Sequence, residues 1–293
     1  MSLIVQMNRS ETPLAILTIC AGVAFLVSND AIAKLLTDRY EPIQIIFLRN
    51  LLALPLIVAL ILALRGAHAL RTHHLRLHAL RGLLIVIGAW AYFTSLKFLP
   101  LAEATALVFS APIFITALSV PLLGESVGWK RWSAVLLGFI GVLVIVQPGG
   151  AAFQPASLLV IATAMLYALF MLSARWIGRD EGLWTMMFFV IVFPMIYSTP
   201  IAIAIWEPVA MADIPLFLAM AVCGSLGITL IGQAFRMAPA AVVAPFDYTA
   251  LIWASGLGWL LWGDIPAGMT IVGAAIIILS GIIIVLREGR VGD

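Results

Sequence analysis

Long apolar runs separated by short polar stretches occupy almost the whole chain. About twenty apolar residues in a helix, at 1.5 Å per residue, cross the roughly 30 Å hydrocarbon core of a bilayer. The pattern predicts ten such helices, over residues 13–33, 42–64, 82–98, 101–123, 132–146, 155–177, 183–206, 214–235, 240–262 and 267–286. The polar stretches between them are too short for a soluble domain. The sequence therefore predicts an all-α membrane protein with ten transmembrane helices.

The two sets of five helices resemble each other when one is shifted by 139 residues. This shift aligns Pro100 with Pro239 and Gly124 with Gly263, and each of the two glycines is followed by an acid. Because each set has an odd number of spans, the second set must enter the membrane in the opposite direction. We therefore predict two inverted five-helix repeats, residues 1–149 and 150–293, separated near a Pro-Gly-Gly break at residues 148–150.

Composition supports lipid as the solvent. The chain is 63% hydrophobic and 10% charged, whereas a soluble domain has about 45–50% apolar and about 25% charged residues. The net charge of +2 is too small an excess to predict nucleic-acid binding. Cys20 and Cys223 lie inside apolar runs, which favours packing positions over a disulfide or a metal site.

Basic residues predict the orientation. With the N-terminus in the cytoplasm, twelve Lys and Arg residues fall on the cytoplasmic side and four elsewhere. Such an excess marks the cytoplasmic side, so we expect a multi-pass protein of the cell inner membrane with both termini in the cytoplasm. Arg65, Arg71, Arg76 and Arg81 make the predicted loop after the second span a contact for anionic lipid headgroups.

Common nucleotide-binding, metal-binding and catalytic motifs are absent from the sequence. There is no phosphate-binding loop for nucleotide hydrolysis, no zinc-protease motif, no Cys-x-x-Cys and no nucleophile elbow. His74 and His78 have the spacing of a helical metal pair, but no Cys or carboxylate lies nearby in the sequence to complete a metal shell. We therefore predict a non-enzyme with no cofactor and no metal, whose energy comes from a gradient or a partner subunit.

Ionised side chains inside the predicted spans are the first binding candidates, because one at the bilayer centre costs roughly 2.5–3.5 kcal/mol. Arg49 and Asp247 lie deepest. Arg49 could bind a substrate carboxylate through its planar fork, or else pair with an acid or with helix-end carbonyls. Asp247 could bind substrate, or else hold an internal partner that only fixes packing. Asp30 and Lys34, four residues apart, predict an internal ion pair.

Aromatic and hydroxyl side chains complete the predicted site. Pro112 frees a backbone carbonyl in mid-membrane and could serve as a hinge or a binding group, or simply as a packed kink. The predicted substrate-binding residues are Arg49, Trp90, Thr94, Pro112, Tyr167, Asp247, Tyr248 and Trp253.

Several short motifs carry a family resemblance. They are residues 28–34 (SNDAIAK) in the first span, 47–49 (FLR) in the second, and 102–112 followed by 123–125 (LGE) in the fourth, with a counterpart from 238–240 (APA) to 263–264 (GD). In this order they resemble the EamA-type proteins of the drug/metabolite transporter superfamily. The sequence departs from the pattern at Leu251, where the repeat predicts a second mid-helix proline. The kink of the ninth span is therefore an open question.

The resemblance implies a basket of helices around a central cavity, lined mainly by spans 1, 3, 4, 6, 8 and 9, with spans 5 and 10 at the periphery. It also implies transport of amino acids, vitamins, nucleotide-linked metabolites or drugs. We expect alternating-access export of amino acids with broad specificity, and uptake of riboflavin or a nucleotide-like metabolite as the alternative. An alternative of another class is a membrane enzyme or structural subunit.

The expected partners are a small-molecule substrate and membrane lipids, but not nucleic acid. The sequence leaves the oligomeric state open, with a homodimer among the options.

Overall fold

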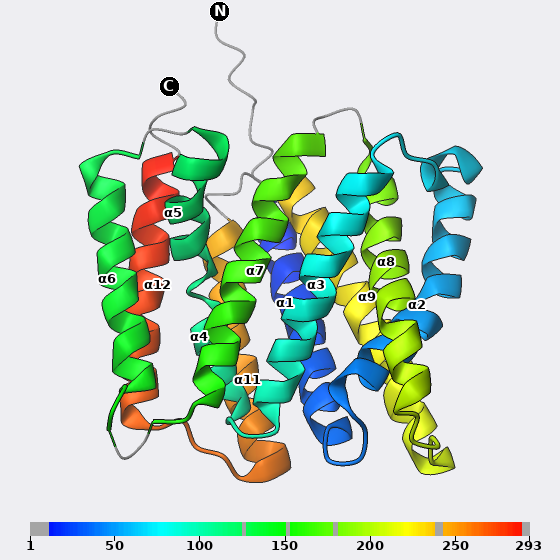
Figure 1. Ribbon diagram of the computed structural model, residues 1–293. Helices are drawn as coiled ribbons and strands as arrows, with labels where there is room; N and C mark the ends of the chain where they lie inside the picture. The colour runs from blue at the N-terminus through cyan, green and yellow to red at the C-terminus, as the bar shows by residue number, and fades with distance from the viewer. Residues whose placement is uncertain (1–11, 125–126, 151–152, 178–180, 238–242, 289–293) are drawn as a thin grey trace, which may run out of the picture.

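The first half of the chain folds into six helices and one short 3-10 turn. The computed structural model describes residues 12–124, 127–150, 153–177, 181–237 and 243–288, and every regular element in these ranges is helical (Figure 1). In chain order the elements are α1 (Thr12–Leu36), α2 (Pro42–Leu64), η1 (Ala67–Leu70), α3 (Leu75–Leu96), α4 (Leu101–Val108), α5 (Ala111–Leu123) and α6 (Trp129–Val146).

The second half is likewise helical in its described residues. Its elements are α7 (Ala156–Ile177), α8 (Leu183–Ala204), η2 (Met211–Asp213), α9 (Ile214–Met237), η3 (Ala244–Thr249), α11 (Ala250–Trp262) and α12 (Gly268–Glu288). The helices run side by side along a common axis (Figure 1). We call the lower edge of this view, where α1 is followed by α2, the α1–α2 end, and the upper edge the α2–α3 end.

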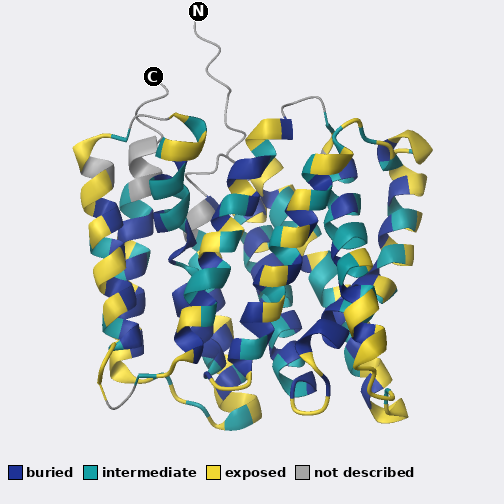
Figure 2. Ribbon diagram, viewed as in Figure 1, coloured by how far each residue is buried: buried dark blue, intermediate teal, exposed yellow. Residues whose placement is uncertain are grey.

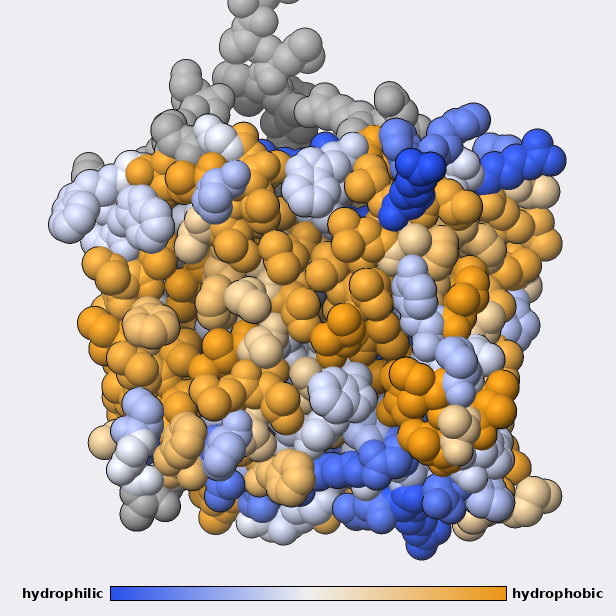
Figure 3. All heavy atoms as spheres, viewed as in Figure 1, coloured by the Kyte–Doolittle hydropathy of each residue, from blue (hydrophilic) through white to orange (hydrophobic). Residues whose placement is uncertain are grey.

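The lengths and surface of the helices suit a bilayer. Within the described residues, seven helical stretches are long and apolar enough to cross a membrane: α1, α2, α3, α7, α8, the α4–α5 stretch and the η2–α9 stretch. Residues Trp132–Val146 and Gly268–Ile283 form shorter apolar helices. Hydrophobic side chains cover the middle of the face in Figure 3, and hydrophilic ones gather at its upper and lower edges. The prediction of an all-α membrane protein is confirmed.

Most predicted span limits agree with the structure to within three residues, but the third was wrong. Its predicted start was residue 82, whereas α3 begins at Leu75. Leu and Arg are good helix formers, and the partners that α7 supplies to Arg81 let this charged residue stay inside the helix. Arg81 therefore lies in α3 and not in the basic loop.

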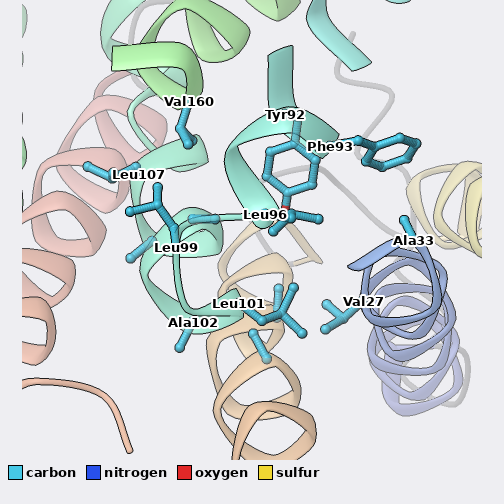
Figure 4. Packing of buried hydrophobic residues seen from close by; sticks show 14 of the residues in the cluster. Val27, Ala33, Tyr92, Phe93, Leu96, Leu99, Leu101, Ala102, Leu107 and Val160 are labelled. Carbon is cyan, nitrogen blue, oxygen red and sulfur yellow. The ribbon is translucent and has the colours of Figure 1, made fainter. Parts of the chain in front are cut away.

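The helices pack in pairs across the two halves. The most extensive contacts are α1 with α9, α3 with α7, α2 with α8, and α6 with α12. Buried residues gather where helices face one another (Figure 2). Figure 4 shows part of this core, where Val27 of α1, Leu96 of α3, Leu101 of α4 and Val160 of α7 belong to one buried cluster. The α6–α12 pair forms one edge of the bundle (Figure 1), in the place that the family resemblance implies for spans 5 and 10.

The predicted fourth and ninth spans are both interrupted. The fourth consists of α4 and α5, with Phe109 and Ser110 between them, and η3 precedes α11. Both α5 and α11 have 13 residues and end at a left-handed glycine, Gly124 with φ 67° and Gly263 with φ 71°. The two glycines are 139 residues apart, the offset of the predicted repeat. The repeat also aligns Glu125 with Asp264 and Pro100 with Pro239. Glu125 and Pro239 lie outside the described residues.

Candidate functional site

The break in the fourth span lies beside Pro112, for which the sequence predicted a hinge, a binding group or a packed kink. Pro112 is in the first turn of α5, where a proline that lacks the backbone N–H is best tolerated. The Ser110 carbonyl accepts the N–H of Ile113 at 3.0 Å, and the Thr116 hydroxyl donates to the Pro112 carbonyl at 2.9 Å. The result is two short helices in place of one kinked helix. Phe109 lies at the junction.

The ninth span is broken although Leu251 replaces the expected proline. Ala244–Thr249 forms a 3-10 helix with Pro245 in its first turn. Asp247 lies in this segment, and its side chain is exposed. No hydrogen bond or ion pair to Asp247 occurs among the described residues. A 3-10 segment with a proline in its first turn therefore precedes α11, and this segment contains the acid.

Two tyrosines lie near Asp247, and one of them contacts a phenylalanine. Tyr248 contacts the Phe109 ring edge to face at a centroid distance of 4.9 Å. Tyr167 of α7 is 46% exposed, and it lies close enough to Asp247 for the two groups to interact electrostatically. We call Asp247, Tyr248, Tyr167 and Phe109 the Asp247 group. An unpaired carboxylate close to aromatic rings suits an organic cation, because both the charge and the ring faces attract it.

Arg49 belongs to a second group, between α1, α2 and α3. Its guanidinium interacts electrostatically with Asp30 and lies 5.8 Å from the centroid of the Phe93 ring. The Asn29 amide donates to Asp30 at 3.0 Å, and the Tyr92 hydroxyl donates to it at 3.3 Å. The structure thus places Arg49 beside an acid, one of the two roles left open by the sequence. No contact joins Arg49 to Asp247 within the described residues.

No ring contact or side-chain hydrogen bond among the described residues joins the remaining predicted site residues to these two groups. Trp90 of α3 is 44% exposed and Trp253 of α11 is 43% exposed. The Thr94 hydroxyl oxygen is buried, and it has no hydrogen-bond partner among the described residues. These three residues stay predicted binding residues.

The predicted Asp30–Lys34 ion pair was wrong. The Lys34 ammonium donates to the Leu99 carbonyl at 2.7 Å and lies 3.8 Å from an Asp264 carboxylate oxygen. It also lies 4.9 Å from the centroid of the Trp262 ring. Three partners from distant parts of the chain therefore replace the neighbour one helical turn away.

Further polar contacts join the two halves at the α1–α2 end. Gln44 and Glu207 exchange two hydrogen bonds, from the Gln44 amide to the Glu207 carbonyl at 2.7 Å and from the Glu207 N–H to the Gln44 amide oxygen at 2.9 Å. The Tyr40 hydroxyl donates to Asp213 at 2.8 Å, and Arg39 lies 3.0 Å from the same carboxylate. Together with Lys34 and Asp264, these contacts hold this end of the bundle together.

A histidine and an acid meet at the opposite end. His78 is buried, with its Nε2 atom 2.5 Å from Glu181, and its ring stacks on Phe189 at 4.6 Å. The Thr72 hydroxyl also donates to Glu181. Burial raises the pKa of Glu181, but the hydrogen bonds from Thr72 and His78 outweigh it and leave the pKa below its usual value. The sequence did not reveal this acid, because it follows His78 by 103 residues.

The prediction that Arg81 contacts lipid headgroups was wrong. It is buried, and its Nη1 atom donates to the Phe170 carbonyl at 2.9 Å and to the Ser173 hydroxyl at 3.0 Å. Its position on α3 therefore faces α7 and not the lipid.

Similar proteins of known family identify the family of this chain. A family model described as the EamA-like transporter family matches residues 13–147. The riboflavin transporter of Vibrio cholerae is 30% identical over 91% of this chain and 90% of its own length. The chain belongs to the EamA-like transporter family. This EamA-like transporter is thus a member of the drug/metabolite transporter superfamily, as the sequence motifs indicated.

Other relatives of the EamA-like transporter have different named cargoes. The S-adenosylmethionine uptake transporter of Rickettsia bellii is 28% identical and aligns over 90% of both chains. The pseudopaline exporter CntI of Pseudomonas aeruginosa is 24% identical over 90% of this chain and 93% of its own length. A solved crystal structure with 22% identity covers 96% of this chain with a TM-score of 0.61, which supports the fold alone.

Proposed function

We propose that this EamA-like transporter consists of ten spans in two inverted repeats and works by alternating access without ATP hydrolysis. The helix pairs support this architecture. Exchanging each helix for its counterpart in the other half converts the α1–α9 pair into the α7–α3 pair, and leaves α2–α8 and α6–α12 unchanged. These are the contacts that a twofold axis in the membrane plane produces. The equal lengths of α5 and α11 also support it.

The Asp247 group carries the proposal for the substrate. It combines an exposed, unpaired carboxylate with the rings of Phe109, Tyr167 and Tyr248. Such a site favours a metabolite that carries an organic cation together with a flat ring. S-adenosylmethionine has a sulfonium, an amino-acid group and an adenine ring, and it is the named cargo of a relative that aligns over 90% of this chain. We therefore place it first.

In this proposal the predicted substrate range, amino acids in general, becomes a metabolite that contains an amino-acid group. The amino-acid portion of the substrate is kept, but none of the named relatives above is described as a carrier of free amino acids. Riboflavin is the second candidate, because the aromatic rings can stack on its flavin and a relative at 30% identity is named for it. A carrier that hydrolyses no nucleotide follows the gradients across the membrane, so direction is measured in the same assay.

The test is transport by the purified full chain in liposomes. Labelled S-adenosylmethionine, riboflavin and a panel of amino acids are offered under imposed pH and voltage gradients. We expect saturable S-adenosylmethionine transport, reduced at least about tenfold by Asp247→Asn, because the variant loses the charge that attracts the cation. Glu207→Gln is the matched control, since this acid is exposed at the α1–α2 end, and it should transport like wild type.

Each outcome of this assay has a defined meaning. Riboflavin transport without S-adenosylmethionine transport would favour the flavin-stacking alternative. If correctly inserted protein moves no member of the panel under any gradient, the substrate proposal is wrong. Arg49→Gln, tested in parallel, shows whether the Asp30–Arg49 contact only holds the helices together or also affects substrate affinity.

The proposed inner-membrane location has cytoplasmic termini. The support is the twelve-to-four distribution of basic residues. Reporter enzymes that are active only outside the cytoplasm, fused after residue 150 and after residue 288, test it. We expect activity from the first fusion and none from the second.

A further inference from the structure

Arg81 lies between α3 and α7 with no acid beside it among the described residues. Its side chain is almost fully enclosed, since the residue is 4% exposed. The Phe170 ring lies 4.1 Å from the guanidinium carbon, and the two hydrogen bonds to α7 both come from the Nη1 atom. The side chain is thus held at one edge by a single helix.

The other edge of the guanidinium makes no hydrogen bond to any described residue. The Nε atom is buried and has no hydrogen-bond partner within the described part of the chain. The Nε–Nη2 edge is one of the edges through which arginine binds a carboxylate or a phosphate with two parallel hydrogen bonds. A buried donor normally has a partner, so an unused edge in this position points to a ligand.

The charge of Arg81 leads to the same conclusion. A charge enclosed in the membrane requires a counter-charge. Lys34 has Asp264 at 3.8 Å, and Arg49 has Asp30. Within the described residues Arg81 has only a carbonyl, a hydroxyl and a ring face. An oxyanion at the free edge would satisfy both the charge and the unused donors.

We propose that the Nε–Nη2 edge of Arg81 binds an oxyanion of the transported metabolite, in the first place a carboxylate. This inference rests on the proposed transport function. Arg81 and the Asp247 group are connected by one face of α7, because the Tyr167 ring lies 6.3 Å from the Phe170 ring that covers Arg81. A metabolite that reaches both Asp247 and Arg81 must therefore extend along this face of α7.

Because Arg81 is buried, a ligand can reach it only after a movement of the helices. Since the side chain is enclosed between α3 and α7, the two helices must separate before the free edge meets a ligand. Alternating access supplies such a movement. The metabolite, rather than a lipid headgroup, is the proposed source, because Arg81 is six residues inside α3, roughly 9 Å from its first residue.

The test compares two probes that differ only in the carboxylate. S-adenosylmethionine and its decarboxylated analogue are bound to the purified full chain in phosphatidylcholine nanodiscs. Wild type should bind the carboxylate form about 10- to 100-fold more tightly, the value of a hydrogen bond to a charged group. Arg81→Gln should bind the two probes equally. Arg76→Gln, which removes an exposed charge from the same helix, should keep the wild-type ratio.

The variant Arg81→Lys separates geometry from folding. It keeps the charge but not the fork, so a smaller preference for the carboxylate is expected. Because the readout is a ratio of two affinities of the same protein, a general loss of stability does not change it. If Arg81→Gln does not fold, the lysine variant decides. A wild-type ratio in that variant would then overturn the proposal.

The remaining outcomes distinguish this proposal from the transport function. Equal binding of both probes by wild type, or an unchanged ratio in Arg81→Gln, overturns the role of Arg81 alone. Binding of neither probe by wild type overturns the proposed substrate, and the Arg81 assignment with it. An effect of Arg81→Gln that appears only in nanodiscs with added phosphatidylglycerol, without a change in the ratio, assigns the oxyanion to lipid and likewise overturns the proposal.

Discussion

The close contact between α1 and α9 predicts how a substitution at Gly22 changes the stability of the fold. Gly22 of α1 is buried against α9. A Cβ atom added to it would lie 2.9 Å from both the Cγ1 and the N atom of Ile231, and 3.0 Å from the Gly227 carbonyl oxygen. Two of these atoms belong to the backbone, so no side-chain rotation can relieve the clash. Gly22→Ala must therefore move the two helices apart.

The magnitude follows from two opposing terms. Carbon atoms in contact settle about 3.5–4.0 Å apart, so the local separation is roughly 0.5–1 Å. Overpacking of this kind costs about 1–3 kcal/mol, whereas alanine in place of glycine inside a helix gains about 1 kcal/mol. The net effect is a loss of up to about 2 kcal/mol in the free energy of unfolding.

Gly232→Ala in α9 is the matched control. No heavy atom lies within 4 Å of the Cβ that it would add, so only the helix-propensity gain of about 1 kcal/mol applies. The two variants should therefore differ by about 1–3 kcal/mol and move in opposite directions. Apparent unfolding midpoints in one detergent, measured at one scan rate because membrane proteins often unfold irreversibly, report the order of the variants.

Two results would refute this reasoning. The first is that both substitutions shift the midpoint equally, and the second is that Gly22→Ala unfolds above wild type. A double variant refines the test, because Ile231→Ala in the Gly22→Ala background removes the clash with the side chain and leaves the clash with the backbone N atom. Only partial recovery of the midpoint is expected.

Two other contacts give further predictions. Because hydrogen bonds lower the pKa of Glu181 below its ordinary value of 4.5, its ionised form stabilises the fold. This contribution is complete above pH 4.5 and is lost as the pH falls through the lowered pKa. Glu181→Gln should therefore weaken the dependence of the unfolding midpoint on acid, and an unchanged profile would contradict this. Gly281→Ala places a Cβ against the Tyr248 hydroxyl, so it should impair transport, whereas Gly268→Ala, which meets no atom within 4 Å, should not.

Periodicity and composition were sufficient for the helices, because in lipid every apolar run of sufficient length must satisfy its backbone internally. The break at Phe109 was also predictable, since Pro112 cannot donate a backbone hydrogen bond. The break before Ala250 was not, because the residue aligned with Pro112 is Leu251, and Pro245 acts instead from the preceding turn. Turn chemistry upstream of a helix is harder to detect than a proline inside it.

Side-chain partners were predicted less well than helices. Sequence spacing favoured Asp30 for Lys34, yet Lys34 contacts Asp264, 230 residues later in the chain. Arg81 was assigned to a loop because basic residues near a span end usually face the headgroups, but α7 supplies its partners. Contacts of this kind depend on how the two halves pack, which no local pattern contains.

The presence or absence of a counter-charge beside each buried ionised residue bears on the substrate. An ionised group in a bilayer is costly unless a partner offsets it, and the structure offsets the charges of Lys34 and Arg49 with acids. Within the described residues, Asp247 and Arg81 have no such counter-charge. Two charges of opposite sign that are unpaired within the described residues, both close to one face of α7, suit a molecule that carries both signs. This reasoning favours a zwitterionic metabolite over a neutral one.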